Sequence, residues 1–345
     1  MGKTKFSELL TKKQFALIVS FFFILMYLLY YTFFTPNNYT GSSPQRFEIE
    51  KGESLNSVIE DLYAKGIIPN KTNMKIVAFI YGAEKKIRAA RYEIPNGLSY
   101  VELVELFLSG KADFLRKVKV YAGSSMKSVA STLKLEVFID SSAFVETANT
   151  KSFLDSLGIN ASSVLGYLLP GEYYIYERSD PREVIRAFNG EFNNFVRDSL
   201  KIDMQNQKYS LNEIVTLASI VEGETKKISE MPIIAGVYYN RLRIGMKLQA
   251  DPTVQYLQPN GWKRLNHLDL KLESPYNTYK YFGLPPGPIN NPGRNALYAA
   301  ANPEMHNYLY FVADGTGGHI FSKNYSQHLR FVRSYRKWLE AQKGS

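Results

Sequence analysis

The feature that most limits what this chain can fold into is an uncharged stretch of twenty residues near its N-terminus, from Phe15 to Phe34. A helix rises about 1.5 Å per residue, so a stretch of this length spans the hydrocarbon core of a bilayer. Four lysines lie within residues 1–14, which predicts that this segment stays in the cytoplasm. The sequence therefore predicts a transmembrane helix over residues 15–34, with the rest of the chain outside the cytoplasmic membrane.

A cleaved signal peptide is the alternative interpretation of this stretch. Signal peptides have a shorter apolar core that ends in a small-x-small cleavage site. Here the stretch ends in Phe33-Phe34-Thr35-Pro36, which contains no such site. An uncleaved anchor is favoured, and residues 35–44, which are rich in Asn, Ser and Pro, are expected to form a linker.

Composition narrows the classes of partner. A length of 345 residues fits two or three domains, and a net charge of +10 favours anionic partners. The basic residues are scattered and form no zinc-finger or RNA-binding signature, so no nucleic-acid partner is expected. The 25 tyrosines suit a carbohydrate surface, although tyrosines also decorate core edges. The absence of cysteine excludes disulfides and a thiol nucleophile.

A weak internal repeat follows the linker. Residues 52–59 (GESLNSVI) align with residues 123–130 (GSSMKSVA), and each copy lies between an alternating strand and a helical apolar pattern. Serine in each copy is expected to cap the helix. A short strand followed by a short helix is the layout of a LysM-like glycan-binding module, which residues 45–112 fit better than the second repeat and connecting region at 113–160. A generic βα unit remains the alternative.

The C-terminal part is expected to be a helix-rich α+β domain over residues 161–345. Apolar periodicity predicts helices at 181–200 and 230–244, and a third helix that ends before Pro303. A strand, a glycine turn and a second strand precede a final basic helix. The fold class predicted for the whole chain is thus α+β, with an N-terminal transmembrane helix and one or two LysM-like βα modules.

The common catalytic motifs find little support. No pair among the four histidines has metal-ligand spacing, and no metal or cofactor is expected. A Ser-x-x-Lys at Ser124 lacks the Lys-Thr-Gly that a serine transpeptidase requires. No nucleotide-binding or hydrolase-elbow motif is present.

One segment, residues 211–225 (LNEIVTLASIVEGET), reads as a buried helix with a carboxylate at its end. At 100° per residue, Glu222 shares the apolar stripe of Val215 and Ala218, whereas Glu224 lies near Glu213. Apolar surroundings raise a carboxyl pKa, so Glu222 is the candidate proton donor. A glutamate that merely caps or pairs at the helix end is the alternative.

This segment resembles the Ala-Ser-Ile-Val-Glu-Lys-Glu motif of the MltG (YceG-like) endolytic transglycosylase family. Further blocks resemble the family in the same order, at residues 166–173, 239–254, 274–279, 283–293 and 310–321. Several positions depart from the family pattern: Leu165, Gly171, Glu172, Gly223, Ala250, Asn290 and Asn324. None of these replaces Glu222, but Leu165 and Gly171-Glu172 could remodel a glycan groove.

The resemblance implies an enzyme that cleaves the MurNAc–GlcNAc β-1,4 bond of peptidoglycan without water, in a catalytic domain at residues 161–345. Glu222 would protonate the leaving oxygen and then take the proton of the MurNAc 6-hydroxyl, which attacks C1 and leaves a 1,6-anhydro end. Because the attacking hydroxyl is tethered, one carboxyl group suffices. The implied setting is nascent peptidoglycan at the cytoplasmic membrane, with peptidoglycan synthases as possible partners. A non-catalytic, membrane-tethered glycan-binding scaffold is the alternative function.

The remaining candidate site residues carry groups that can hydrogen-bond a sugar: Asn240, Gln249, Tyr276, Asn277 and Thr278. Each could equally be structural. Glu224 is a candidate that tunes Glu222 or is simply solvated. Asp251, a further supporting candidate, also fits a helix N-cap before Pro252.

Overall fold

The computed structural model describes residues 11–200, 208–259 and 263–343. The chain divides into two compact units, residues 1–115 and 116–345, and each has its own hydrophobic core. The mixed α+β composition with a helix-rich body, predicted from the sequence, is confirmed.

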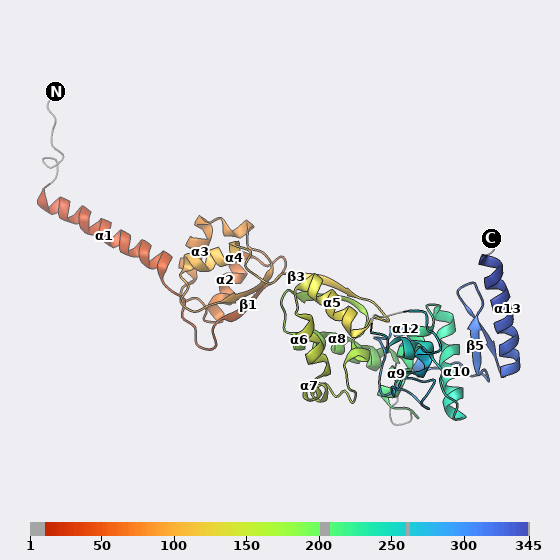
Figure 1. The fold of residues 1–345 in the computed structure, drawn as a ribbon. Helices are drawn as coiled ribbons and strands as arrows, with labels where there is room; N and C mark the ends of the chain where they lie inside the picture. The colour runs from red at the N-terminus through yellow and green to blue at the C-terminus, as the bar shows by residue number, and fades with distance from the viewer. Residues whose placement is uncertain (1–10, 201–207, 260–262, 344–345) are drawn as a thin grey trace. The chain divides into compact units, whose positions relative to one another are not determined.

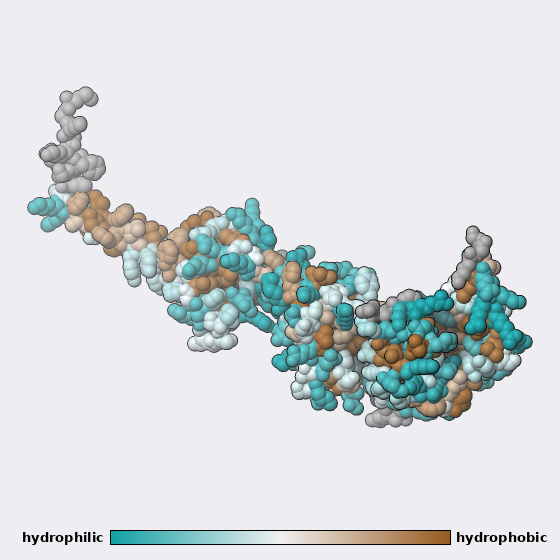
Figure 2. Space-filling view, in the orientation of Figure 1, coloured by the Kyte–Doolittle hydropathy of each residue, from teal (hydrophilic) through white to brown (hydrophobic). Residues whose placement is uncertain are grey.

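The N-terminal apolar stretch forms helix α1 (Lys12–Phe34), which begins with a capping box between Thr11 and Gln14. None of its residues is buried, and apolar side chains cover its length in the space-filling view (Figure 2). Within the described residues, it is the one helix long and apolar enough to cross a membrane. The expected apolar helix is therefore present.

The rest of unit 1 follows the order β–α–α–β–α. Its elements are β1 (Gln45–Ile49), α2 (Leu55–Ala64), α3 (Lys71–Ile80), β2 (Ala90–Ile94) and α4 (Tyr100–Leu108). β1 and β2 pair antiparallel, with Phe47 opposite Tyr92, and the inward side chains of both strands are buried. Ser54 caps α2 by accepting from the Ser57 N–H, as the repeat predicts.

Residues 35–44, expected as a linker, belong to unit 1 and are held against its strands and turns. Asn37 is buried, and its side chain accepts from the Leu98 N–H at 2.7 Å and donates to the Pro95 carbonyl at 3.1 Å. Tyr39 joins the core and donates to the Ile94 carbonyl. The turn after β2 supplies these hydrogen-bond partners. Composition cannot reveal such distant partners, so it predicted only a linker.

The first part of unit 2 contains the second repeat. Its elements are β3 (Leu115–Val120), α5 (Met126–Val137), α6 (Ser141–Asn149), α7 (Lys151–Ser156), β4 (Gly171–Tyr176) and α8 (Pro181–Phe195). β3 pairs with β4, and Ser125 caps α5 by accepting from the Ser128 N–H. The apolar face of α5 lies in the same core as the helices that follow, so the second repeat is part of the C-terminal unit.

Three helices form the centre of unit 2. They are α9 (Leu211–Glu224), α10 (Met231–Arg243) and α12 (Arg294–Ala301), which pack against one another (Figure 1). The short helix α11 (Asp251–Gln255) packs on α9. The hairpin β5 (Tyr310–Ala313) and β6 (His319–Ser322) packs against α13 (Tyr325–Lys343).

Short turns complete the described chain: η2 (Ala83–Lys85), η3 (Leu165–Tyr167), η4 (Val196–Leu200), η5 (Ile228–Glu230) and η6 (Asp269–Lys271). The helix predicted at 181–200 is α-helical to Phe195 and continues as the π-helical turn η4. The predicted helices at 230–244 and before Pro303 correspond to α10 and α12, and the predicted strands to β5 and β6.

Candidate active site

Helix α9 carries the predicted catalytic carboxyl group through the core. Ser210 and Glu213 form a capping box at its start, which satisfies backbone N–H groups that a helix leaves unpaired. All residues from Ile214 to Glu222 are buried, as the apolar pattern predicts. Such a helix is held by packing on every side and therefore fixes the position of the side chain at its end.

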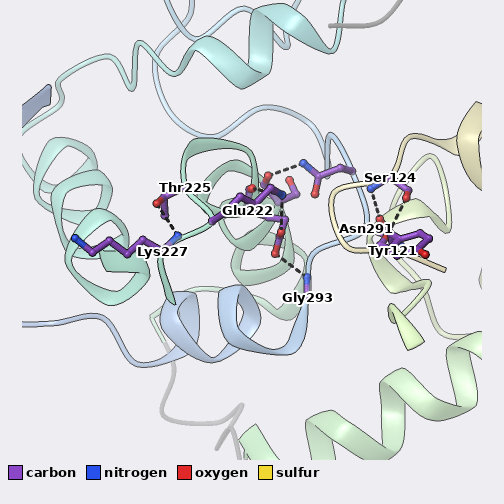
Figure 3. A network of polar contacts seen from close by, with 10 residues as sticks. Tyr121, Ser124, Glu222, Thr225, Lys227, Asn291 and Gly293 are labelled. Carbon is purple, nitrogen blue, oxygen red and sulfur yellow. Dashed lines mark hydrogen bonds and ion pairs between the residues drawn. The ribbon is translucent and has the colours of Figure 1, made fainter. Parts of the chain in front are cut away.

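The Glu222 carboxyl group is held by two donors. The residue is 5% exposed, and its Oε2 accepts from the Gly293 backbone N–H at 3.1 Å (Figure 3). Its Oε1 accepts from the Lys226 Nζ at 3.1 Å. Gly293 is the N-cap of α12, whose first turn presents unpaired N–H groups and positive charge. The surroundings were expected to be apolar; they are apolar along the helix stem but polar at the carboxyl group.

Two glycines allow the chain to approach Glu222 closely. A Cβ on Gly293 would lie 3.1 Å from Glu222 Oε2, and one on Gly123 would lie 3.6 Å from Glu222 Cγ. Gly123 also has a φ of 75°, a conformation that other residues rarely adopt. The turn of the second repeat therefore lies beside the carboxyl group.

Asn291 fixes this turn in place. Its carbonyl accepts from the Gly123 N–H at 2.9 Å, and its Oδ1 accepts from the Ser124 N–H at 2.6 Å. Figure 3 shows Ser124 and Asn291 joined in this way, beside the loop that leads to Gly293. A single loop thus positions both the Gly293 donor and the turn at Gly123.

Glu222 lies at an open groove of about 1040 Å³. One wall is formed by residues between 123 and 131 at the start of α5, and the other by the end of α9, residues 252–259 and Ile289-Asn290. Asn290 donates from Nδ2 to the Ser219 carbonyl at 2.8 Å, while its buried Oδ1 has no partner among the described residues. The groove therefore combines one buried carboxyl group with serine hydroxyls, three amide side chains, two lysines and the ring of Tyr256.

Three of the predicted sugar-binding residues make internal hydrogen bonds. The Asn277 Nδ2 donates to the Leu270 and Leu272 carbonyls, and the Thr278 Oγ1 accepts from the Ala250 N–H. The Asn240 Nδ2 donates to two carbonyls of the loop before β5. Asn277 and Thr278 are buried, so these contacts give them structural roles, and a contact with a sugar stays a prediction.

Tyr276 and Gln249 lie in different surroundings. The Tyr276 ring contacts the ring of Tyr256, with centroids 4.8 Å apart, and Tyr256 lines the groove. Gln249 has a φ of 49°, which is uncommon outside glycine, and lines a second, smaller cavity.

This second cavity, here named the Glu224 pocket, has a volume of about 250 Å³. Its polar lining consists of Glu224, Arg241, Gln249, Asp251 and His328, and four aromatic side chains complete it. Glu222 thus lines the groove and Glu224 lines the pocket, although only Gly223 lies between them in the chain.

Glu224 is not the solvated carboxylate that one interpretation of the helix face suggested. It is partly buried and accepts from the Tyr238 hydroxyl. Burial raises the pKa of Glu224 to about 7, and the negative charge of Asp251 adds to this effect, whereas the Tyr238 hydrogen bond and Arg241 oppose it. The sequence patterns predicted no such shift for Glu224, so this raised pKa is a finding of the structure.

Asp251 is the first residue of α11, and Ala250 occupies the N-cap position. The expected N-cap role of Asp251 is thus wrong by one residue. Its carboxylate instead accepts from the Tyr279 hydroxyl at 2.5 Å, so it faces the Glu224 pocket.

Four residues near the carboxyl group were not among the predicted site residues: Gly123, Lys226, Asn290 and Gly293. The spacing of Glu222 and Lys226, i and i+4 on a helix, could have indicated their ion pair. The other three are distant in sequence, and no local pattern reveals them. Within the described ranges, no group of three or more His, Cys, Asp or Glu side chains could hold a metal ion.

Comparisons with known proteins agree with this architecture. The chain is 28% identical over 302 residues to the endolytic murein transglycosylase of Bacillus subtilis, with 83% of each chain covered. It is 26% identical to the endolytic murein transglycosylase of Streptococcus pneumoniae, of which it covers 57%.

Among solved structures, a YceG-like protein of Listeria monocytogenes matches with a TM-score of 0.57 at 26% identity, covering 83% of this chain and 98% of that one. The model of the YceG-like family matches residues 47–334, which include the groove, the Glu224 pocket and most of unit 1. The chain therefore belongs to the YceG-like family.

Proposed function

We propose that the chain is an endolytic peptidoglycan lytic transglycosylase with Glu222 as its catalytic acid and base. The observation that carries this proposal is the buried Glu222 carboxyl group at an open groove, held at both oxygens by Gly293 and Lys226. Relatives at 26% to 28% identity that are named endolytic murein transglycosylases support the same activity.

The proposed reaction balances without water. The Glu222 carboxylic acid donates its proton to the glycosidic oxygen, the C1–O bond breaks, and the GlcNAc 4-hydroxyl leaves. The resulting carboxylate then takes the proton of the MurNAc 6-hydroxyl as this oxygen bonds to C1, which regenerates the acid. The product is a 1,6-anhydro-MurNAc end.

One carboxyl group suffices because the nucleophile belongs to the substrate. A tethered hydroxyl has a high effective concentration, so no second carboxylate has to activate water. This agrees with the position of the other two motif carboxylates, since Glu224 and Asp251 line the Glu224 pocket and not the groove.

A digest of purified glycan strands tests this function. Wild-type protein should release fragments lighter by one water than hydrolysis products, and Glu222→Gln should release none while remaining folded. Hydrolysed ends would contradict the transglycosylase mechanism. The absence of any cleavage by the wild-type protein would favour the non-catalytic scaffold.

We also propose that α1 is a single-pass anchor with a cytoplasmic N-terminus, and that residues 45–112 form a LysM-like glycan-binding module. The exposed apolar surface of α1 and the preceding lysines support the anchor. The β1–α2–α3–β2 order with an antiparallel strand pair supports a compact module. Removing residues 1–34 should release the protein from membranes, and a fragment of residues 36–115 should bind glycan oligomers weakly.

An anchored enzyme would act on nascent strands close to the membrane and end their elongation beside a peptidoglycan synthase. Because residues 35–44 are held against unit 1, a longer tether is better introduced after the exposed Lys111, before unit 2 begins. A flexible insertion there should change the glycan length distribution in cells. An unchanged distribution, with expression and activity in vitro preserved, would count against membrane distance as the governing variable.

A further inference from the structure

The Glu224 pocket is not used by the proposed mechanism, yet it is a formed cavity directly behind the groove. Glu222 and Glu224 are two residues apart at the end of α9, and Pro252 lines the groove while its neighbour Asp251 lines the pocket. A Cβ on Gly223 would lie 2.7 Å from the Pro252 Cβ, so the segments that carry these two residues are in direct contact. Gly223 and Pro252 therefore form a thin ridge between the two cavities.

Both hydrogen-bond donors and hydrogen-bond acceptors line the pocket. Tyr238 and Tyr279 each donate to one carboxylate, which fixes Glu224 and Asp251 in position. His328 has a buried Nδ1 with no partner among the described residues. The pocket thus presents oriented acceptors together with the His328 ring nitrogen.

Aromatic rings supply the rest of the lining. The ring of Tyr310 lies against His328, with centroids 5.3 Å apart and an interplanar angle of 25°. Tyr325 contacts both of these rings. Flat rings beside oriented carboxyl and amide groups suit a pyranose, because the rings pack on its C–H faces while the polar groups bind its hydroxyls.

We propose that the Glu224 pocket binds one uncharged N-acetylated pyranose of the glycan strand, at a position beyond the sugars that flank the scissile bond. This inference rests on the proposed function. The pocket volume of about 250 Å³ limits the ligand to a single ring or a group of similar size. Glu224, Asp251 and Gln249 act as acceptors and donors for its hydroxyl and acetamido groups.

The charges of the pocket favour a neutral ligand. Glu224 and Asp251 repel an anion, while the Arg241 guanidinium between β5 and the α10–α11 loop disfavours a cation. Arg241 donates to the Leu309 and Leu248 carbonyls, so it is fixed in the lining. A polyhydroxylated sugar satisfies these groups without adding charge.

The groups that face Glu224 define the expected pH dependence. They are Tyr238 and Arg241 of α10, Asp251 of α11, Tyr279, and His328 of α13. The pKa of Glu224 is raised to about 7 by burial, whereas burial lowers the pKa of His328. An ionised carboxylate accepts stronger hydrogen bonds than a neutral one, so sugar binding should tighten as Glu224 ionises.

The test uses the full chain carrying Glu222→Gln and a β-1,4-linked N-acetylglucosamine hexamer as the probe, titrated calorimetrically at about pH 6 and about pH 8. Binding should be tighter at the higher pH, and Glu224→Gln should remove this difference. Gln249→Asn keeps an amide and tolerates the positive φ, and should weaken binding about three- to tenfold. Glu191→Gln on the exposed surface of α8 is the matched control and should change neither result.

The outcomes separate this inference from the proposed function. If the wild-type enzyme forms 1,6-anhydro ends but the Glu224 and Gln249 variants bind the hexamer as the parent does, the pocket proposal is overturned and the enzyme proposal stands. If a disaccharide probe shows the same losses as the hexamer, the pocket lies at the cleavage site and not beyond it, which also overturns the proposal. If the wild-type protein cleaves nothing, the proposed function fails.

Discussion

Glu222 and Glu224 share the last turn of α9, yet their carboxyl groups have opposite surroundings. Glu222 faces an open groove and receives an ammonium group and a backbone N–H. Glu224 faces a small cavity and accepts a hydrogen bond from the Tyr238 hydroxyl, with the charge of Asp251 nearby. The comparison shows that a helix can direct two identical side chains to different chemistry, because different elements cover its two sides.

The largest expected effect is the difference in kcat between variants of the two carboxyl groups. Glu222→Gln should lower kcat by about 10³-fold or more, since general acid–base catalysis contributes roughly 10²–10⁴-fold. Glu224→Gln should retain most of the wild-type kcat on short strands, because its side chain does not line the groove. Rates of 1,6-anhydro product formation measure both. If Glu224→Gln were inactive and Glu222→Gln active, the two assignments would be exchanged.

The second effect concerns how Glu222 is positioned. In Gly293→Ala the new Cβ would lie 3.1 Å from the Glu222 Oε2 and 3.2 Å from the Ala122 Cβ, so the carboxyl group must move. A displacement near 1 Å can cost about 10²-fold in rate, so a shift of a few tenths of an ångström should lower kcat by about five- to tenfold. Gly190→Ala, whose Cβ would meet nothing within 4 Å, is the control. An unchanged kcat in folded Gly293→Ala would show that the close approach does not matter.

The third effect concerns stability. The pKa of Glu224 rises from 4.5 to about 7 in the folded chain, so folding takes up a proton between these values. Stability should therefore fall as pH rises from about 4.5 to about 7, by roughly 3 kcal/mol in total, and stay at the lower level above that. The side chain in Glu224→Gln cannot ionise, so the stability of this variant should not show this decrease between about pH 4.5 and about pH 7.

Chemical denaturation across this pH range, on the detergent-solubilised chain, measures the difference between wild type and Glu224→Gln. The exposed Glu191→Gln is again the control. A variant that keeps the wild-type pH profile would show that Glu224 ionises as readily in the folded chain as in the unfolded chain.

The contrast between the two carboxyl groups also shows how far the sequence could predict the site. The apolar pattern placed α9 correctly and put Glu222 and Glu224 on different faces. The pattern could not show that Tyr238 of α10 covers the face of Glu224, because that depends on the packing of a helix fourteen positions further along the chain. The partial burial of Glu224 and its raised pKa were therefore not predicted.

The groove shows the same limit. Gly123, Asn291 and Gly293 meet at Glu222 from three segments that lie between 69 and 170 positions apart, joined by hydrogen bonds such as that of the Ser124 N–H to Asn291. Periodicity describes one element at a time and cannot predict such a meeting. Chemical type alone also could not show that the polar groups of Asn277 and Thr278 are buried against internal hydrogen-bond partners, and their contact with a sugar stays a prediction.

The smallest expected effect concerns the ion pair at Glu222. The Lys226 side chain is 76% exposed, although that of Glu222 is only 6% exposed. An ion pair with one end in solvent contributes about 0–1 kcal/mol, so Lys226→Met should change kcat/KM by less than about fivefold, and Lys226→Arg by less still.

The backbone N–H of Gly293, in contrast, cannot move away from the carboxyl group, because the loop that carries it is tied to the turn at Gly123. Steady-state rates at low and high salt distinguish the two donors: the contribution of Lys226 should decline as salt screens it, whereas that of Gly293 should persist. A loss in Lys226→Met as large as that in Gly293→Ala would mean that the lysine acts on the bound substrate as well as on Glu222, and the groove would then have a cationic subsite beside its catalytic acid.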